Sequence, residues 1–218
     1  MTEKWLGLAL IAPLNVHPSL LPKYRGPTPA QAALLNGDTE SGLSLIKMTK
    51  GMDEGPIAFQ EKMRIEAGTT CDELFTQFAE LAAKKIPDAI LRVAEKGDAT
   101  FKDQDSAQAS YCKMTNREDG RIDFNEAAEK IYNRFRAYTP WPGIFTMYEG
   151  KRLKLLDITL GEKNLKPGLV HYESGTLIIG TSKSSLQIKL LQLEGKKSAS
   201  VEAFISGYPK FCESSLPS

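Results

Sequence analysis

The hydrophobic pattern of this 218-residue chain changes near residue 100, and the change limits what the chain can fold into. Before it, apolar residues recur at helical spacing behind a Thr70–Glu73 capping box, which predicts one long helix that packs on a sheet and ends at Gly97. Pro87 is expected to kink or interrupt this helix. Beyond residue 140, short apolar runs alternate with turns, which favours a small barrel. These runs are Ile144–Tyr148, Leu153–Leu160, Leu169–Tyr172, Thr176–Gly180 and Leu186–Leu193.

The segment between the two patterns is polar and aperiodic, as is typical of a linker. We therefore expect a first domain over residues 1–99, a linker over 100–110 and a second domain over 111–218. A second capping box, Asp123–Glu126, predicts a helix that ends before Pro140. A final helical turn is expected at Ser200–Ile205.

Two polar residues at the end of the apolar run Leu6–Leu14 are the first candidates for chemistry. Asn15 and His17 are two positions apart, so on a strand their side chains point to the same face. The run predicts a buried strand, and Pro18–Gly26 reads as a loop. The pair is therefore expected at the carboxyl end of a strand, where open α/β sheets bind ligands.

A third candidate, Asp53, lies in the glycine-flanked turn Gly51–Gly55 between the predicted strands Gly42–Met48 and Pro56–Ile65. The glycines permit positive φ and close backbone approach. Asp53 reaches the imidazole of His17 if the two strand ends are neighbours.

An amide, an imidazole and a carboxylate without a nucleophilic serine or cysteine suit acyl transfer between two amines. Asn15 and a protonated His17 would stabilise the oxyanion, and Asp53 would take the proton from the attacking amine. A histidine beside a strand end is more often structural, so the spacing alone leaves both interpretations open.

The two halves of the chain differ in charge. Residues up to 110 carry 12 basic and 15 acidic side chains, and the remainder carries 16 and 12. A basic second domain favours binding along a phosphate backbone, although such charges also decorate ordinary solvated surfaces. The candidate RNA contacts are Arg25, Lys130, Arg134, Arg136, Lys151, Arg152, Lys154, Lys196 and Lys197.

The cysteines and histidines are too few and too scattered for a zinc site. Cys71, Cys112 and Cys212 form no CxxC motif, and reduced thiols in the cytoplasm are the simplest interpretation. The run Leu6–Leu14 is far shorter than the roughly 20 apolar residues that cross a bilayer, and it lacks a convincing signal-peptide cleavage site. We expect no metal, no membrane association and no DNA partner.

Several motifs in the first half resemble those of the folate-dependent formyltransferases. They are Asn15–Pro22 (NVHPSLLP) with the following Lys23–Gly26, then Asn36–Gly42 and Gly51–Ile57. In the second half, Asp119–Phe124 and Arg136–Gly143 resemble the carboxyl-terminal domain of methionyl-tRNA formyltransferases. The resemblance extends from about Asn15 to Tyr208.

This resemblance implies that Asn15, His17 and Asp53 form the catalytic triad. It also implies that Ser19, Leu20, Leu21 and Pro22 contact the tetrahydrofolate. The implied fold is a Rossmann-like α/β sheet with flanking helices, followed by an OB-like β-barrel. The implied reaction, part of translation initiation, moves a formyl group from 10-formyltetrahydrofolate to the α-amino group of initiator methionyl-tRNA.

The family carries several βα units before the Asn-x-His strand, and this sequence has only Met1–Leu14 there. We therefore expect a catalytic domain without its amino-terminal part, in a monomer that needs that part for activity. Two alternatives stay open: a catalytically impaired RNA-binding fragment, and a formyltransferase that acts on a small amine. The Arg136–Gly143 motif and the basic second half argue against the small acceptor.

Overall fold

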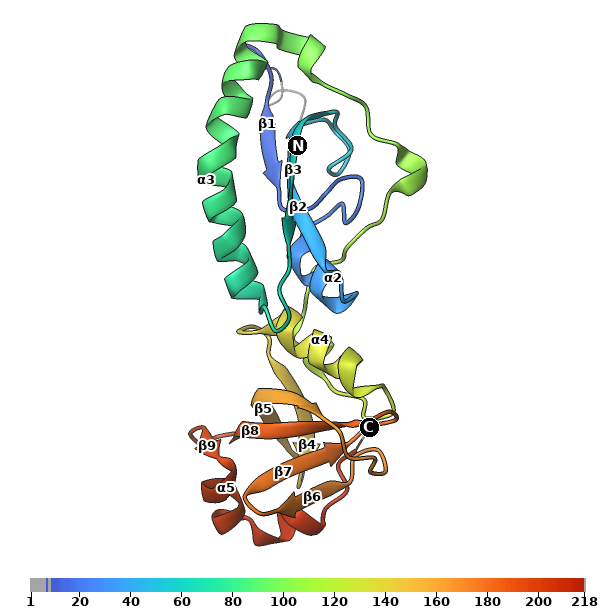
Figure 1. Cartoon of the computed structure of the whole chain (residues 1–218), viewed down its shortest axis with the longest axis vertical. Helices are drawn as coiled ribbons and strands as arrows, with labels where there is room; N and C mark the ends of the chain where they lie inside the picture. The colour runs from blue at the N-terminus through green and yellow to red at the C-terminus, as the bar shows by residue number, and fades with distance from the viewer. Residues whose placement is uncertain (1–6, 8, 218) are drawn as a thin grey trace. The chain divides into compact units, whose positions relative to one another are not determined.

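The computed structural model describes residues 7 and 9–217, and the chain divides into two compact units with the boundary between Thr115 and Asn116 (Figure 1). Residues 100–110, expected as a linker, lie along the first unit. Lys102 exchanges backbone hydrogen bonds with Ile57, and Tyr111 pairs with Arg25. The segment carries no periodic pattern because its contacts are made by single backbone pairings and isolated side chains.

The first unit is built on a three-stranded sheet in the order β1-β2-β3. Its strands are β1 (Leu14–His17), β2 (Glu40–Lys47) and β3 (Ile57–Arg64), and both pairings are antiparallel. The predicted second and third strands are confirmed to within two residues. Within the described residues this sheet is antiparallel throughout, which differs from the parallel sheet of a Rossmann-like arrangement.

The first strand begins later than its apolar run predicts. Leu6 and Leu8 lie outside the described residues, whereas Leu10 and Ile11 are exposed. Pro13 has no N–H to donate, so only its carbonyl oxygen takes part, accepting the Met48 N–H at 2.7 Å, and paired residues begin at Leu14. Asn15 and His17 lie opposite Ile46 and Ser44 of β2, and because β1 ends at His17 the pair is at the carboxyl end of the strand, as expected.

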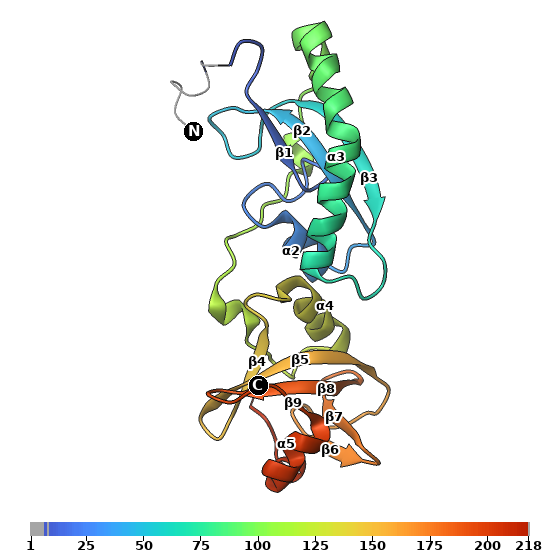
Figure 2. The ribbon, with the colours of Figure 1, turned by 90° about the vertical axis from the view of Figure 1, so that its left-hand side faces the viewer.

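A single long helix, α3 (Cys71–Lys96), covers one face of this sheet (Figures 1 and 2). Its first turn is capped as predicted, since the Thr70 N–H donates to the Glu73 carboxylate at 2.8 Å. The helix ends at Gly97, which has a φ of +56°. Pro87 does not interrupt the helix. A short helix that the sequence analysis missed, α2 (Pro29–Leu35), contacts α3.

The second unit is a helix followed by an antiparallel sheet. It contains α4 (Ala128–Tyr138), β4 (Ile144–Tyr148), β5 (Lys151–Gly161), β6 (Val170–Glu173), β7 (Thr176–Gly180), β8 (Ser185–Leu193), β9 (Ala199–Ser200) and α5 (Val201–Gly207). The strand order is β4-β5-β8-β7-β6, with β9 on β8. In the described part of the chain no pairing joins β4 to β6, so no closed barrel is found and the expected OB-like barrel is not confirmed.

The predicted helix start in this unit is wrong. Asp123 accepts from the Asn125 N–H and so closes a local turn, and α4 begins only at Ala128. An Asx turn and a helix cap use the same side-chain bond, which makes them hard to tell apart in a sequence. No helix over residues 7 and 9–217 is apolar for long enough to cross a membrane.

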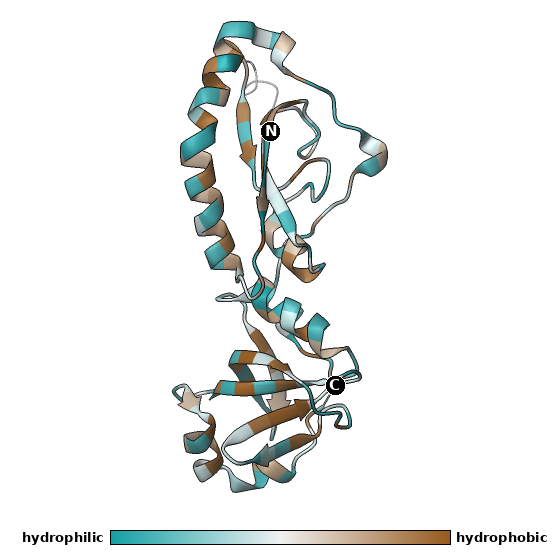
Figure 3. Cartoon of the chain, viewed as in Figure 1, coloured by the Kyte–Doolittle hydropathy of each residue, from teal (hydrophilic) through white to brown (hydrophobic). Residues whose placement is uncertain are grey.

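The core of the second unit lies on one face of its sheet, under α4, α5 and the carboxyl-terminal turn Pro209–Glu213. Figure 3 shows that β7 is strongly hydrophobic, whereas hydrophobic and hydrophilic residues alternate along β8. Phe211 is fully buried there, with its ring 4.9 Å from that of Tyr148 and 5.1 Å from that of Phe204. The last turn of the chain therefore belongs to this core.

Replacing Phe211 with alanine should destabilise the second unit by about 3–5 kcal/mol, because the change leaves a cavity in a closely packed aromatic cluster. Hydrogen exchange of the β7 and β8 amides measures the effect. Leu160→Ala is the control, since Leu160 belongs to the same unit but is 49% exposed, and it should change stability by about 0.5 kcal/mol or less. Equal exchange rates in both variants would show that Phe211 does not anchor this core.

Candidate active site

The structure brings His17 and Asp53 together, as the sequence analysis expected. The Nδ1 atom of His17 lies 3.6 Å from Oδ2 of Asp53, and both side chains are largely buried. The other ring nitrogen, Nε2, lies 2.9 Å from the carbonyl oxygen of Tyr24. Because a carbonyl oxygen only accepts, Nε2 carries the proton in this contact and Nδ1 is left facing the carboxylate. Both edges of the imidazole are therefore oriented by the protein.

The carboxylate of Asp53 is held by one backbone hydrogen bond, and the Asp53 backbone has an uncommon conformation. Its Oδ2 accepts the Gly26 N–H at 2.8 Å, and Asp53 itself adopts a left-handed φ of +54°, which aspartate tolerates better than most residues. The expectation that Gly51 and Gly55 supply the positive φ is wrong. Gly55 is needed for a different reason: a Cβ there would lie 1.7 Å from the carbonyl oxygen of Lys47.

Asn15 shares a face of β1 with His17 because it lies two residues before it. Its side chain is partly exposed and makes no hydrogen bond to any residue that the structure describes. An amide that is held on a strand and still has free donors can hydrogen-bond to a ligand. The arrangement therefore provides an oriented imidazole, a buried carboxylate and an available amide.

A buried arginine and a glutamine, neither of which the sequence analysis placed in the site, brace the Asp53 loop. Arg25 is 2% exposed, and its Nε and Nη2 donate to Oε1 of Gln104 at 3.0 and 2.8 Å. The amide nitrogen of Gln104 then donates to the carbonyl oxygens of Asp53 (2.8 Å) and Gly55 (2.7 Å). A turn that carries a catalytic candidate is thus tied to a segment fifty residues later in the sequence.

This result changes the interpretation of Arg25, which was predicted to contact RNA. Its guanidinium lies inside the first unit and is bonded to Gln104 and to the Tyr111 hydroxyl, so it is not available to a phosphate backbone. Arg136 is also buried, at 7% exposure, and donates to the Asn133 side chain. Burial lowers the pKa of Arg136. Because both side chains are buried, we do not propose Arg25 or Arg136 as RNA contacts.

The remaining RNA candidates lie in the second unit with different degrees of exposure. Lys130, Arg134 and Arg152 form ion pairs, the first two with Glu126 and the third with Glu118. Lys151, Lys196 and Lys197 are exposed, and Lys154 is half-buried.

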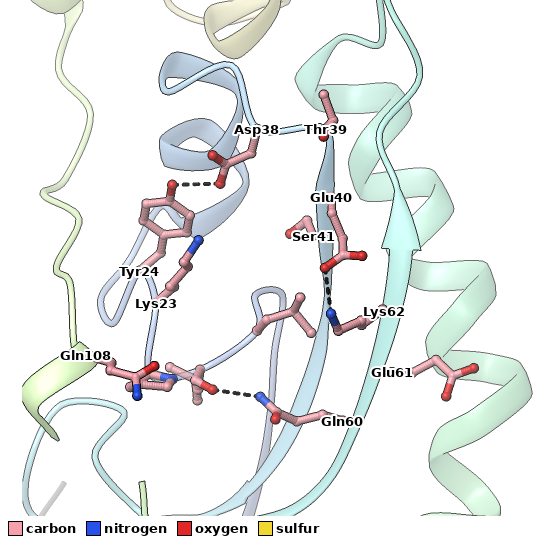
Figure 4. Close-up of a pocket in the computed structure, with 13 residues that line it drawn as sticks. Lys23, Tyr24, Asp38, Thr39, Glu40, Ser41, Gln60, Glu61, Lys62 and Gln108 are labelled. Atoms are coloured by element: carbon pink, nitrogen blue, oxygen red, sulfur yellow. Dashed lines mark hydrogen bonds and ion pairs between the residues drawn. The ribbon is translucent and has the colours of Figure 1, made fainter. Parts of the chain in front are cut away.

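The loop predicted to contact folate forms one wall of a cavity of about 900 Å³ (Figure 4). Leu20, Leu21 and Pro22 line it directly, whereas Ser19 is fully buried and its hydroxyl donates to the Lys23 carbonyl oxygen at 2.6 Å. Ser19 therefore shapes the loop from within.

The rest of the lining is largely polar, and Figure 4 shows two of its pairs: Tyr24 with Asp38 and Glu40 with Lys62. Burial and the hydrogen bond to Asp38 raise the pKa of Tyr24 to about 12. The Tyr24 hydroxyl consequently stays protonated and keeps donating to Asp38 throughout the neutral range. The cavity combines an apolar floor with fixed hydrogen-bonding groups.

Comparison with known proteins identifies the fold family of both units. Residues 8–90 match the family model described as formyl transferase, and residues 114–209 match the formyl transferase carboxyl-terminal domain. A methionyl-tRNA formyltransferase from Acidobacterium capsulatum is 40% identical over 94% of this chain and 67% of its own length. The chain belongs to the formyl transferase family. The resemblance seen in the sequence motifs is thereby confirmed.

The relatives are longer than this chain. A methionyl-tRNA formyltransferase from Thermotoga neapolitana is 39% identical over 89% of the chain and 63% of its own length. The chain thus spans about two thirds of the curated relatives that it matches.

Solved structures show the same fold. HypX from Aquifex aeolicus, in complex with tetrahydrofolic acid, superposes with a TM-score of 0.66 at 20% identity over 91% of this chain and 35% of its own. An N-formyltransferase from Helicobacter canadensis, in complex with folinic acid and dTDP-3-aminofucose, gives 0.64 at 22% identity over 80% and 64%.

The three cysteines are free, and burial raises the pKa of the Cys71 thiol to about 12. Among the described residues, no three histidine, cysteine or acidic side chains gather into a metal-binding group.

Replacing Gln104 with leucine should destabilise the first unit by about 3 kcal/mol, because it leaves the buried Arg25 charge and two loop carbonyl groups with fewer partners. Urea denaturation measures this loss. Gln108→Leu is the matched control in the same segment, since the Gln108 amide bonds only to the exposed Asp105 side chain among described residues. If the two variants unfolded at the same urea concentration, Gln104 would not brace the site.

Proposed function

We propose that this chain transfers a formyl group from 10-formyltetrahydrofolate to the α-amino group of methionyl initiator tRNA, a step in translation initiation. In this proposal the first unit is catalytic and the second binds the tRNA. The observation that carries the proposal is the contact between His17 and Asp53, with Asn15 on the same face of β1. The names of the curated relatives support the choice of reaction.

Each residue of the trio has a chemical role in this reaction. As the amine adds to the formyl carbon, the formyl oxygen becomes negatively charged and accepts hydrogen bonds from the Asn15 amide and from Nδ1–H of a protonated His17. Nε2–H stays on the Tyr24 carbonyl oxygen, whereas Nδ1, 3.6 Å from Asp53, is beyond hydrogen-bond distance of that carboxylate. Asp53 takes the proton that leaves the attacking nitrogen, directly or through a water molecule. The Asp53 carboxylate also stabilises the charged imidazolium. A proton returns to the departing nitrogen as its bond to the formyl carbon breaks.

The cavity lined by Leu20, Leu21 and Pro22 fits a folate. No residue of the trio lines it, and the link between the two is Tyr24, which lines the cavity and whose carbonyl oxygen accepts the His17 Nε2–H. Bound 10-formyltetrahydrofolate supplies an activated formyl carbon, and its flat ring system needs an apolar surface edged by hydrogen-bonding groups. Leu20, Leu21 and Pro22 provide that surface, and Gln60 and Gln108 line the polar edge. The volume of about 900 Å³ lies within the range of roughly 300–1,000 Å³ for small-molecule sites.

A second acceptor class is favoured by one specific observation, the likeness to a Helicobacter canadensis enzyme in complex with dTDP-3-aminofucose. The second unit argues for tRNA, because from residue 116 onward it holds 15 basic and 12 acidic side chains. A direct assay separates the acceptors: the chain is incubated with 10-formyltetrahydrofolate and either methionyl initiator tRNA or dTDP-3-aminofucose. Formylmethionine supports the proposal. A formylated sugar, or tRNA binding without any transfer, overturns it.

His17→Ala should lower formyl transfer about 10²–10⁴-fold while tRNA affinity changes little, because the change removes a proton-transfer group and not a phosphate contact. Rapid-quench measurement of formylmethionine tests this. The control is His171→Ala, the chain's other histidine, which is in the second unit beside Lys163 and Glu173. Equal turnover in the two variants would remove His17 from the mechanism.

Affinity for tRNA should fall steeply as salt rises, and replacing both Lys196 and Lys197 with glutamine should flatten the log–log slope by about 1–2, since each phosphate contact releases counterions. Filter binding at several salt concentrations gives the slope. Lys163→Gln is the control, because Lys163 is already paired with Glu173. A slope that is the same in all three proteins would exclude the two lysines from the interface.

A further inference from the structure

The Pro140–Gly143 motif forms part of a pocket that the proposed reaction does not use. This pocket in the second unit has a volume of about 300 Å³ and is lined by Arg117, Trp141, Phe145, Arg152, Lys154 and Gln192, among others. Trp141 is 57% exposed. An indole left this open to water at the mouth of a pocket has apolar surface to offer a ligand.

The strand register places the pocket on the outer face of the sheet. Phe145 of β4 is directly opposite Lys154 of β5, which is directly opposite Gln192 of β8. Their sequence neighbours Ile144, Leu153 and Leu191 are buried in the core on the other face. Side chains alternate along a strand, so the row formed by Phe145, Lys154 and Gln192 points away from the core.

One basic group of the pocket, Arg152, is held in position. The Arg152 guanidinium lies over the Phe145 ring, 4.5 Å from its centroid, and is paired with Glu118. Glu194, an acidic residue of the lining, accepts the backbone N–H of Arg152 at 3.0 Å. Arg117 and Lys154 add two further positive charges to the lining. The exposed Lys196 and Lys197 follow immediately after the lining residue Gly195.

This lining selects a ligand with a flat aromatic face, hydrogen-bonding edges and a negative charge. A nucleotide has all three: bases stack on aromatic side chains, and phosphates bind arginine and lysine. The Gln192 amide nitrogen already donates to the Lys196 carbonyl oxygen at 3.0 Å, which fixes the side chain and leaves its oxygen as an acceptor. An acidic peptide would satisfy the positive charges but would leave the indole and this oxygen unused. The observations therefore favour a nucleotide over a peptide.

We propose that this pocket binds one unpaired nucleotide of an RNA, with the base stacked on Trp141, its edge hydrogen-bonded to Gln192 and the phosphate held by Arg117 and Lys154. The proposal rests on the RNA partner of the proposed function and adds a specific site to it. It involves no residue of the Asn15, His17 and Asp53 trio, so it can be tested without formyl transfer.

Fluorescence tests the proposal directly. The chain contains two tryptophans, so Trp5→Phe leaves Trp141 as the single reporter. A short single-stranded oligoadenylate should quench its emission, whereas an RNA duplex of the same length should not, because paired bases are unavailable for stacking. Trp141→Ala should weaken oligoadenylate binding, measured by anisotropy of a labelled strand, about tenfold, and Trp141→Phe should recover most of the loss.

Matched variants separate the pocket from general charge. Lys154→Gln should weaken binding, whereas Lys189→Gln, an exposed lysine on the same strand as Gln192 but outside the pocket, should have a much smaller effect. Leu160→Ala controls for loss of an exposed apolar side chain in the same unit.

Four results would overturn the proposal: no quenching by oligoadenylate, unchanged affinity in Trp141→Ala, equal quenching by an acidic peptide, or quenching by free AMP but not by the strand. If the chain bound initiator tRNA and formylated it while the Trp141 fluorescence stayed unchanged, only this pocket assignment would fail. Stacking on Trp141 without formyl transfer would instead overturn the proposed function alone.

Discussion

The burial of one positive charge is the constraint on which the candidate site depends. A guanidinium that is removed from water must find hydrogen-bond acceptors and a countercharge, since its desolvation is otherwise very unfavourable. Arg25 meets this need with the oxygen of Gln104 and the Tyr111 hydroxyl, and the Glu54 carboxylate lies 3.9 Å away. The residues Glu54, Gln104 and Tyr111 thereby surround one side chain, and Gln104 in turn donates to the Asp53 carbonyl oxygen at 2.8 Å, which links the buried charge to the turn that carries the acid.

The site combines rigid and available groups in a way that suits group transfer. His17 has both ring nitrogens directed by the protein, and Asp53 is held by a backbone N–H and by its own left-handed conformation. The Asn15 amide, in contrast, has no partner among the described residues. Preorganised groups of this kind stabilise developing charge without having to reorient during the reaction.

Much of the fold was predictable because it depends on short-range patterns. Regular residue spacing marks the capped helix from Cys71, the turns between strands and the Asn15–His17 pair. Such spacing indicates which face of a helix or strand is buried. The late start of β1 and the role of Arg25 were not predictable in this way. The start of β1 depends on Pro13, which cannot donate a backbone hydrogen bond to the neighbouring strand. The hydrogen-bond partner Gln104 of Arg25 comes from a polar segment that has no hydrophobic periodicity. Which distant residue a side chain meets is decided by tertiary packing, which leaves no local signature.

The same packing determines how little of this chain could work in isolation. The match to the amino-terminal family model stops at residue 90, yet residues that hold the candidate site in place extend to Cys112. The Cys112 backbone packs so closely on Gly26 that a Cβ at that glycine would lie 2.5 Å from the Cys112 carbonyl oxygen. A fragment trimmed to the homologous region would expose an unsatisfied guanidinium and release the turn that carries the acid. A fragment meant to keep the candidate site intact therefore has to include the residues that hydrogen-bond to it, and these extend beyond the region that matches the family.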